Sequence, residues 1–156
     1  MTTPNLLDPP AIAIVTGGSG ALGSAITRGL VRRGNKVVIG YLSGEQAARA
    51  LADELGAEHV ELVRADLADR DAPAALLDAA CARWSHPTIL VNNGGLMTRA
   101  HVAEMSDDTW DHLIDINLSS AFRVARAVIP GMIATGAGRI INVSSQAAYR
   151  GSIGRA

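Results

Sequence analysis

The chain has 156 residues, of which 48% are hydrophobic and 19% are charged, and its net charge is −1. This composition is typical of a globular protein and excludes a disordered chain, and the balanced charge argues against a nucleic-acid partner. The sequence holds a single cysteine, Cys81, which excludes an internal disulfide framework. We therefore expect a reducing cytoplasm as the location of the protein.

The sequence predicts a leader, one domain and no membrane span. Residues 1–10 contain three prolines and no basic residue, which is typical of a flexible leader rather than of a targeting signal. The most apolar stretch, 113–134, is interrupted by charged residues and Pro130, and falls short of the about 18 apolar residues that a span needs. Residues 11–156 contain no repeat or linker, so we assign them to one domain.

Five short apolar runs alternate with four segments of helical spacing. The first run leads through a glycine cluster into a helix in which Leu22, Ile26, Leu30 and Val31 share one face, and Gly34-Asn35 is a typical helix end. The strands are predicted at 11–15, 36–40, 59–63, 88–91 and 139–143, and the helices at 21–33, 47–55, 71–84 and 106–129.

Local signals mark where three of these helices begin. Ser43-Gly44-Glu45-Gln46 fits a capping box in which the serine is the N-cap of the second helix. Asp71 and Pro73 open the third helix, and Ser106, followed by two aspartates, opens the fourth.

The alternation of strands and helices predicts an α/β fold. Strands connected through helices form a parallel sheet with helices on both faces, and right-handed crossovers favour a doubly wound, Rossmann-type arrangement. The strands are nearly all apolar, so we expect both faces of the sheet to be buried. The pattern stops after the fifth strand, which we expect to be an exposed edge.

A glycine turn joins the first strand to the first helix. In Thr16-Gly17-Gly18-Ser19-Gly20-Ala21-Leu22-Gly23 the glycines let the backbone approach a pyrophosphate, and the helix N-terminus offers free N–H groups to it. No Gly-Lys-Ser/Thr follows, which excludes a Walker phosphate loop. The segment also approaches the nucleophile elbow of an α/β-hydrolase, but neither His101 nor His112 follows a late strand, so we disfavour that reading.

Several motifs in order resemble the standard short-chain dehydrogenase/reductase family over about residues 11 to 145. They are Thr16-Gly17-x-x-x-Ala21-x-Gly23, with Ala for the usual middle glycine, then Asp66-Leu67, Asn92-Asn93-Gly94-Gly95, with Gly94 for Ala, Asn117, and the strand that ends at Ser144-Ser145. Each motif also has a plain structural interpretation as a turn, a cap or a left-handed residue, and it is their joint order that favours the family.

The resemblance implies hydride transfer between a nicotinamide cofactor and a carbonyl or secondary alcohol. Ser145 would orient the substrate oxygen, and Asn117 would hold a water of a proton relay. The residues expected to bind the cofactor are Thr16, Gly17, Ser19, Ala21, Leu22, Gly23, Tyr41, Ser43, Asp66, Leu67, Asn92 and Gly94.

The sequence departs from the family at the acid/base pair. The family has a Tyr about thirteen residues after the serine and a Lys four residues later, which falls near position 158. Tyr149 is followed four residues later by Ile153 and does not match. The 156 residues are therefore expected to be inactive alone, either as part of a longer protein or as a truncated product. The alternative is a non-catalytic nucleotide-binding module.

The preferred cofactor follows from the end of the second strand. No acid stands between Lys36 and Gly44, so the carboxylate that bonds the ribose 2′-OH of NAD is absent, and we favour NADP while keeping NAD open. The Gly40-Tyr41-x-Ser43 stretch also resembles that of NADPH-dependent 3-oxoacyl-acyl-carrier-protein reductases.

The four histidines have no metal-ligand spacing, so no metal is expected. The resemblance further implies self-association through the helix at 106–129, with an incomplete interface.

Overall fold

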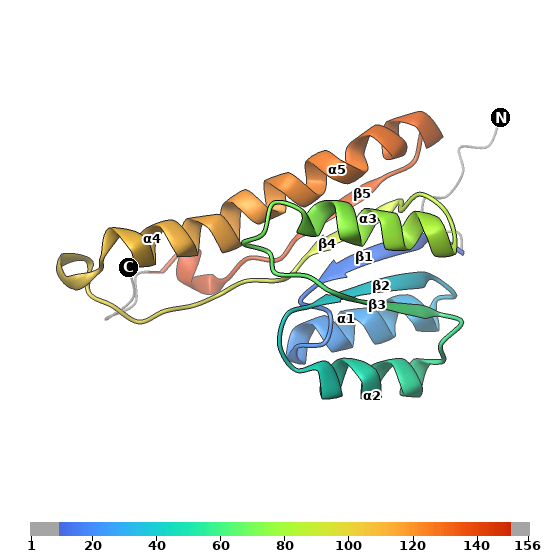
Figure 1. Cartoon of the computed structure of the whole chain (residues 1–156), viewed down its shortest axis with the longest axis horizontal. Coiled ribbons are helices and arrows are strands. Elements are labelled where there is room, and N and C mark those ends of the chain that lie inside the picture. The colour runs from blue at the N-terminus through green and yellow to red at the C-terminus, as the bar shows by residue number, and fades with distance from the viewer. Residues whose placement is uncertain (1–9, 151–156) are drawn as a thin grey trace.

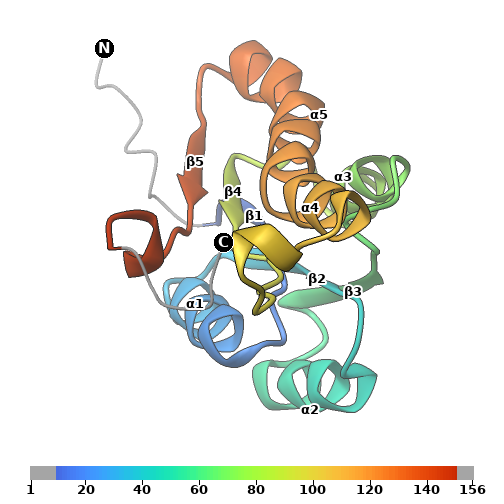
Figure 2. The same cartoon turned by 90° about the vertical axis from the view of Figure 1, so that its left-hand side faces the viewer.

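A computed structural model describes residues 10–150 of the chain. The expected leader over 1–10 lies outside the described part except for Pro10, as do residues 151–156 at the other end. A parallel sheet of five strands in the order β3-β2-β1-β4-β5 forms the centre, with helices on both faces (Figures 1 and 2). This arrangement confirms the predicted doubly wound fold.

The elements follow the predicted order. The strands are β1 (Ile12–Thr16), β2 (Lys36–Tyr41), β3 (Val60–Arg64), β4 (Ile89–Asn92) and β5 (Arg139–Asn142). The helices are α1 (Ala21–Arg32), α2 (Glu45–Leu55), α3 (Ala72–Arg83), α4 (Asp107–Ile114) and α5 (Ser120–Thr135), with a π-helical turn η2 (Asp115–Ser119) between the last two and short 3-10 turns η1 (Val102–Glu104) and η3 (Gln146–Ala148).

The core lies in two layers because successive strand residues point to opposite faces. On one face, Ile14, Val38 and Leu90 are fully buried under α3 and α5. On the other face, Val15 and Ile39 are fully buried under α1 and α2. Figure 1 shows the two pairs of helices on opposite sides of the sheet. Both faces are therefore covered over β1, β2 and β4.

The expectation of burial on both faces is wrong at the two edges. All four residues of β5 are exposed, including Ile141 at 48%, and β3 is mostly half-buried. β5 pairs only with β4 among the described strands, and α5 packs over β4 rather than over β5. The exposed fifth-strand edge that the sequence predicts is present. On α1, Leu22 is likewise exposed at 55% and does not join the core with Ile26.

The predicted capping box at Ser43 is wrong. The N-cap of α2 is Gly44, whose left-handed φ of 76° brings the chain into the helix without any side-chain cap. Ser43 therefore stands one residue too early to bond the first turn. Glu45 instead accepts hydrogen bonds from Arg49, one helical turn later.

The predicted long helix at 106–129 is also corrected. Ser106 is its N-cap, as expected, and its hydroxyl accepts from the Thr109 amide at 3.2 Å. The helix is then interrupted by the π-turn η2, and α5 continues past Pro130 to Thr135, where Gly136 adopts a left-handed φ of 66°. Pro130 lies inside α5 and does not end it. The helix is stabilised by packing of its buried side chains, which include Val124, Val128 and Met132.

Within the described residues, no helix combines the length and the hydropathy that crossing a bilayer requires.

Candidate nucleotide-binding site

A cavity of about 530 Å³ opens at the carboxyl ends of the strands, beside β1, where the strand order reverses. In open α/β sheets this is the place where ligands bind. Every predicted cofactor-binding residue except Asn92 lines this cavity. The structure thus brings together residues from the turns after β1, β2, β3 and β4. Their roles in binding stay predictions.

The glycine turn after β1 is built without room for side chains. Gly17 adopts a left-handed φ of 61°, and a Cβ there would lie 2.9 Å from the Cα of Gly94. A Cβ at Gly23 would overlap the carbonyl oxygen of Gly17 and lie 2.8 Å from the Cα of Gly18. α1 consequently starts in direct contact with the turn, as the sequence motif requires.

The N-terminus of α1 is suited to an anion. Its N-cap is Gly20, which supplies no side-chain acceptor, and the first turn of α1 contains no acidic residue. The first N–H groups of a helix lack partners within the helix, and the helix dipole favours negative charge there. Ser19 and Ala21 flank this end and line the cavity. The start of α1 therefore offers backbone N–H donors to a ligand in the cavity.

Thr16 and Asn93 tie the turn after β1 to the turn after β4. The Thr16 hydroxyl accepts from the backbone amides of Asn93, at 3.0 Å, and of Gly94, at 2.9 Å. The Asn93 side chain donates to the carbonyls of Thr16, at 3.0 Å, and Gly17, at 3.1 Å. Asn93 therefore fixes the floor of the cavity. The sequence signal was present, because Asn93 stands in the same motif as Asn92.

Asn92 takes a different position from its neighbour. Its side chain is buried, donates to the Oδ1 atom of Asn142 at 2.9 Å and to the Ala121 carbonyl at 3.4 Å, and does not line the cavity. Asn92 thus connects β4 with β5 and α5. Its own Oδ1 atom has no hydrogen-bond partner among the described residues.

The far wall of the cavity is formed by the turns after β2 and β3. Tyr41 is buried at 8% exposure, and Ser43 follows in the turn. Asp66 accepts from the Ala68 amide at 2.9 Å, so its carboxylate also stabilises its own turn. Leu67 lies against Gly94. A Cβ built on Gly94 would lie only 2.5 Å from the Cδ1 atom of Leu67. Asp66 is the one carboxylate in the lining, and among the described residues no Lys or Arg lines the cavity.

The two residues predicted to be catalytic lie outside this lining. Ser145 is exposed and caps the η3 turn by accepting from the Ala147 amide at 3.1 Å. Asn117 lies in η2, where its Oδ1 accepts from the Leu96 amide and its Nδ2 donates to the Leu96 carbonyl, both at 2.9 Å. Asn117 therefore fastens the loop after β4 to η2.

Other lining residues were not selected from the sequence. Most of them contribute backbone or apolar surface, which leaves no chemical signature in a sequence. They are Gly20, Gly40, Leu42, Gly44, Ala47, Ala65, Asn93, Gly95, Leu96 and Ile116.

Comparison with known proteins agrees with this geometry. The family model described as short chain dehydrogenase matches residues 11–156. The fold is of the doubly wound Rossmann type, and the chain belongs to the short-chain dehydrogenase family.

Similar proteins include two curated relatives and one solved structure. The chain is 38% identical over 145 residues to 3-oxoacyl-(acyl-carrier-protein) reductase FabG of Salmonella typhimurium, covering 93% of this chain and 59% of that protein. It is 38% identical over 141 residues to NADP-dependent 3-hydroxy acid dehydrogenase YdfG of Shigella flexneri, covering 87% and 54%. The structure of serine dehydrogenase from Escherichia coli matches with a TM-score of 0.80 and 33% identity, over 92% of this chain and 66% of that one. The chain therefore spans a little over half the length of the curated relatives it matches.

Proposed function

We propose that the cavity binds a nicotinamide dinucleotide, and that the chain is the nucleotide-binding part of an oxidoreductase. The observation that carries the proposal is the uncapped N-terminus of α1, which faces the cavity behind a turn that admits no Cβ at Gly17 or Gly23. The turn would hold the pyrophosphate, and Asp66 and Leu67 would contact the adenine.

A bound nicotinamide dinucleotide supplies hydride transfer. In this proposal, Ser145 donates a hydrogen bond to the substrate oxygen and orients it. The side chain of Asn117 already bonds both backbone groups of Leu96, so its first task is to hold the loop after β4 in place. Its contribution to a proton relay remains part of the proposal.

The proposed substrates are carbonyl compounds or secondary alcohols of the 3-oxoacyl class. Support comes from the similarity to the reductase FabG and from the Gly40-Tyr41-x-Ser43 stretch. The proposed cofactor is NADP, because the turn after β2 contains no acid. Arg64 supports this choice, since its Nε atom donates to the Leu42 carbonyl at 3.4 Å and places a guanidinium at the same turn. One relative is itself named as NADP-dependent.

Self-association through the face of α4 and α5 and a cytoplasmic location complete the proposal. Phe122 and Ile133 on α5 are exposed at 60% and 74%, which provides apolar surface for such a contact. The single cysteine fits a reducing compartment.

Fluorescence titration of the purified chain tests the cofactor proposal. NADPH and NADH are added separately, and energy transfer from Trp84 or Trp110 and the nicotinamide emission report binding. We expect saturable binding of both, with the tighter affinity for NADPH. Absence of saturable binding by a folded protein, checked by circular dichroism, would contradict the proposal.

A non-catalytic nucleotide-binding module is the second candidate. Residues 1–156 contain no Tyr with a Lys four residues later, so turnover is the measurement that distinguishes the two candidates. Both candidates require the same dinucleotide binding and differ in turnover.

A further inference from the structure

Thr27 is a buried polar residue in the middle of α1, and its hydroxyl bonds outside its own helix. The residue is 0% exposed, and its Oγ1 atom donates to the carbonyl of Gly18 at 3.3 Å. A helical Ser or Thr hydroxyl usually bonds a carbonyl three or four residues earlier. Ser24 on α1, and Ser120 and Thr135 on α5, donate in that way. The hydroxyl of Thr27 instead reaches into the glycine turn.

The backbone of Gly18 is held at both of its polar groups. Its N–H donates to the carbonyl of Gly40, at the end of β2, at 2.9 Å, and its carbonyl accepts from Thr27. Gly18 is itself buried, so a carbonyl without a donor would be costly there. β2 and α1 together therefore fix the orientation of the peptide group that joins Gly18 to Ser19.

The orientation of this peptide group determines where the Ser19 N–H points. In a planar trans peptide the C=O and the following N–H point in opposite directions. Because the Gly18 carbonyl points inward to Thr27, the Ser19 N–H points outward, and Ser19 lines the nucleotide cavity. Within residues 10–150 this N–H donates to no acceptor, so it is available to a ligand.

We propose that Thr27 is a positioning residue that directs the Ser19 N–H toward a phosphate group of the bound dinucleotide. The inference rests on the proposed function and adds a residue that does not line the cavity. A phosphate oxygen is the acceptor we expect, because backbone N–H groups before a helix N-terminus favour anions. Without the Thr27 hydroxyl, the Gly18 carbonyl would rotate toward water in the cavity and turn the Ser19 N–H away.

Thr27→Val tests the inference, because valine has nearly the shape of threonine and lacks the hydroxyl. Dissociation constants of NADPH and NADH come from fluorescence titration of the folded protein, and that of adenosine from NMR titration. We expect NADPH to bind about three- to tenfold more weakly, the effect of one hydrogen bond, and adenosine to bind unchanged. Distortion of the whole cavity would weaken both ligands equally, so adenosine separates positioning from a merely structural role.

NADH identifies which phosphate accepts the hydrogen bond. Equal weakening of NADH and NADPH would assign the contact to the pyrophosphate, whereas weakening of NADPH alone would assign it to the 2′-phosphate. Either result supports the inference, because the acceptor is a phosphate oxygen in both.

Two further variants control the experiment. Thr27→Ser keeps the hydroxyl and should restore most of the lost NADPH affinity, which a loss of packing would not explain. Thr135→Val makes the same substitution at the C-terminal end of α5, where the hydroxyl bonds only its own helix end, and should bind NADPH normally. If Thr27→Val does not fold, the Ser19 amide signal of the wild type replaces it, and its proton resonance should move downfield on addition of NADPH.

Three results would overturn the inference and leave the proposed function in place. They are equal NADPH affinity in the wild type and a folded Thr27→Val variant, an equal loss of affinity for adenosine and NADPH, and a Ser19 amide signal that NADPH does not move. A wild type that binds no dinucleotide would instead overturn both proposals.

Discussion

Gly17 and Gly23 determine how closely a ligand can approach the backbone after β1. Both positions are too crowded for a Cβ, but for different reasons. At Gly17 the left-handed φ adds backbone strain to the contact with Gly94, whereas Gly23 lies within α1 and is limited by contact alone. Substitutions at Gly17 and Gly23 therefore test whether a ligand binds close to this backbone turn.

The first prediction is that Gly17→Val abolishes dinucleotide binding. The new side chain would displace Gly94 or Asn93, and with it the floor of the cavity. Fluorescence titration with NADPH measures the loss. Gly29→Ala is the control, because a Cβ at Gly29 meets nothing within 4 Å, and it should bind normally and be slightly more stable. Undiminished NADPH affinity in a folded Gly17→Val variant would refute the dinucleotide site.

The second prediction concerns the choice between NADP and NAD. Tyr41→Asp places a carboxylate at the end of β2, where it accepts from a ribose 2′-OH and repels a 2′-phosphate. The ratio of the two affinities should shift toward NAD by about 1–3 kcal/mol, the usual worth of a hydrogen bond to a charged group. Tyr41→Phe removes the hydroxyl without adding charge and should leave the ratio nearly unchanged. A wild type that already prefers NAD would show that the NADP proposal is wrong.

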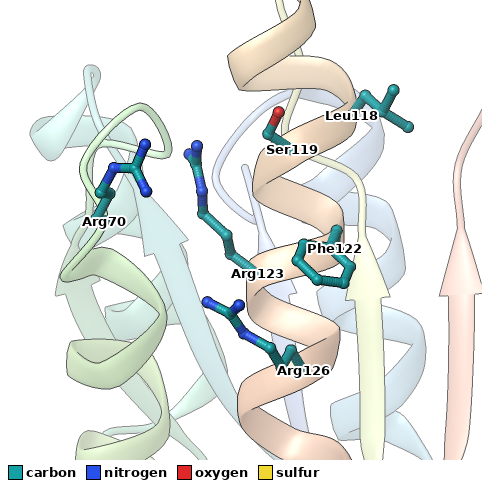
Figure 3. Close-up of a pocket in the computed structure, with 6 residues that line it drawn as sticks. All are labelled: Arg70, Leu118, Ser119, Phe122, Arg123 and Arg126. Atoms are coloured by element: carbon teal, nitrogen blue, oxygen red, sulfur yellow. The ribbon is translucent and has the colours of Figure 1, made fainter.

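The π-turn η2 lies between α4 and α5, and its residues contact different parts of the molecule. Ile116 lines the nucleotide cavity, and Asn117 bonds the loop after β4. Leu118 and Ser119 line a second cavity, together with Arg70 and Arg123 (Figure 3). Consecutive residues of a helical segment point in different directions, so neighbouring residues here can line different surfaces. Buried Ser120 stabilises the turn by donating to the carbonyl of Ile116.

The third prediction is that Asn117→Ala loosens the loop after β4. Two hydrogen bonds to the Leu96 backbone are lost, and both are accessible to solvent, so the free energy of unfolding should fall by about 1–2 kcal/mol. Amide hydrogen exchange should accelerate at Leu96 in particular. Ser119→Ala, in the same turn, is the control. Unchanged protection at Leu96 would show that the contact does not hold the loop.

The fourth prediction is a pH dependence at η2. The hydrogen bond from Arg123 lowers the pKa of Asp115 from its ordinary 3.8, so the folded state binds fewer protons at this group than the unfolded state. The contribution of Asp115 is therefore complete above 3.8 and is lost as the pH falls through the lower folded pKa.

Urea unfolding of Asp115→Asn and of the wild type across this acid range measures the effect. The wild type should be the more stable protein at neutral pH, and the difference should vanish in acid. Asp111→Asn provides the control, because Asp111 forms no ion pair within the described residues. A difference that is independent of pH would assign the effect of Asp115 to packing.

At the scale of the whole molecule, the nucleotide cavity lies away from the β5 edge of the sheet, which is exposed. The exposed residues of β5 and its neighbours include Ile140, Ile141 and Val143. An exposed apolar strand edge favours association with other chains. The lining of the nucleotide cavity contains no residue of β5, because it comes from the other four strands with the turns that follow them, from α1 and α2, and from η2.

The fifth prediction is that the 156-residue polypeptide binds dinucleotide without ordinary turnover. Its sequence contains no Tyr-x-x-x-Lys pair, and the loss of general acid catalysis typically costs about 10²–10⁴-fold in rate. The assay follows nicotinamide absorbance with NADPH and a panel of ketones and 3-oxoacyl thioesters. Turnover at a normal rate, with the mass of the chain verified, would require another proton donor. Tyr149→Phe would then be the first variant to examine.

The order of elements and most of the cavity lining could be predicted from the sequence, because both depend on local patterns. Apolar runs and the glycine turn at Gly17 are such patterns. The π-turn η2 could not be predicted, since one extra residue hardly disturbs a helical period. The sequence also did not predict that Arg70 and Arg123 line one cavity, because they are distant in the sequence and are brought to it only by packing.

The order of strands also sets an order of folding. β1 pairs with β2 across a single helix, at Ile12 and Lys36, and β2 pairs with β3 in the same way. β1 reaches β4 at Ala13 and Ile89, with α1, β2, α2, β3 and α3 in between. The entropy cost of closing a loop grows with its length. Pairing β1 with β2 and β2 with β3 therefore costs less entropy than pairing β1 with β4. We therefore expect the nucleotide cavity, which lies across that junction, to be among the last features to form as the chain folds.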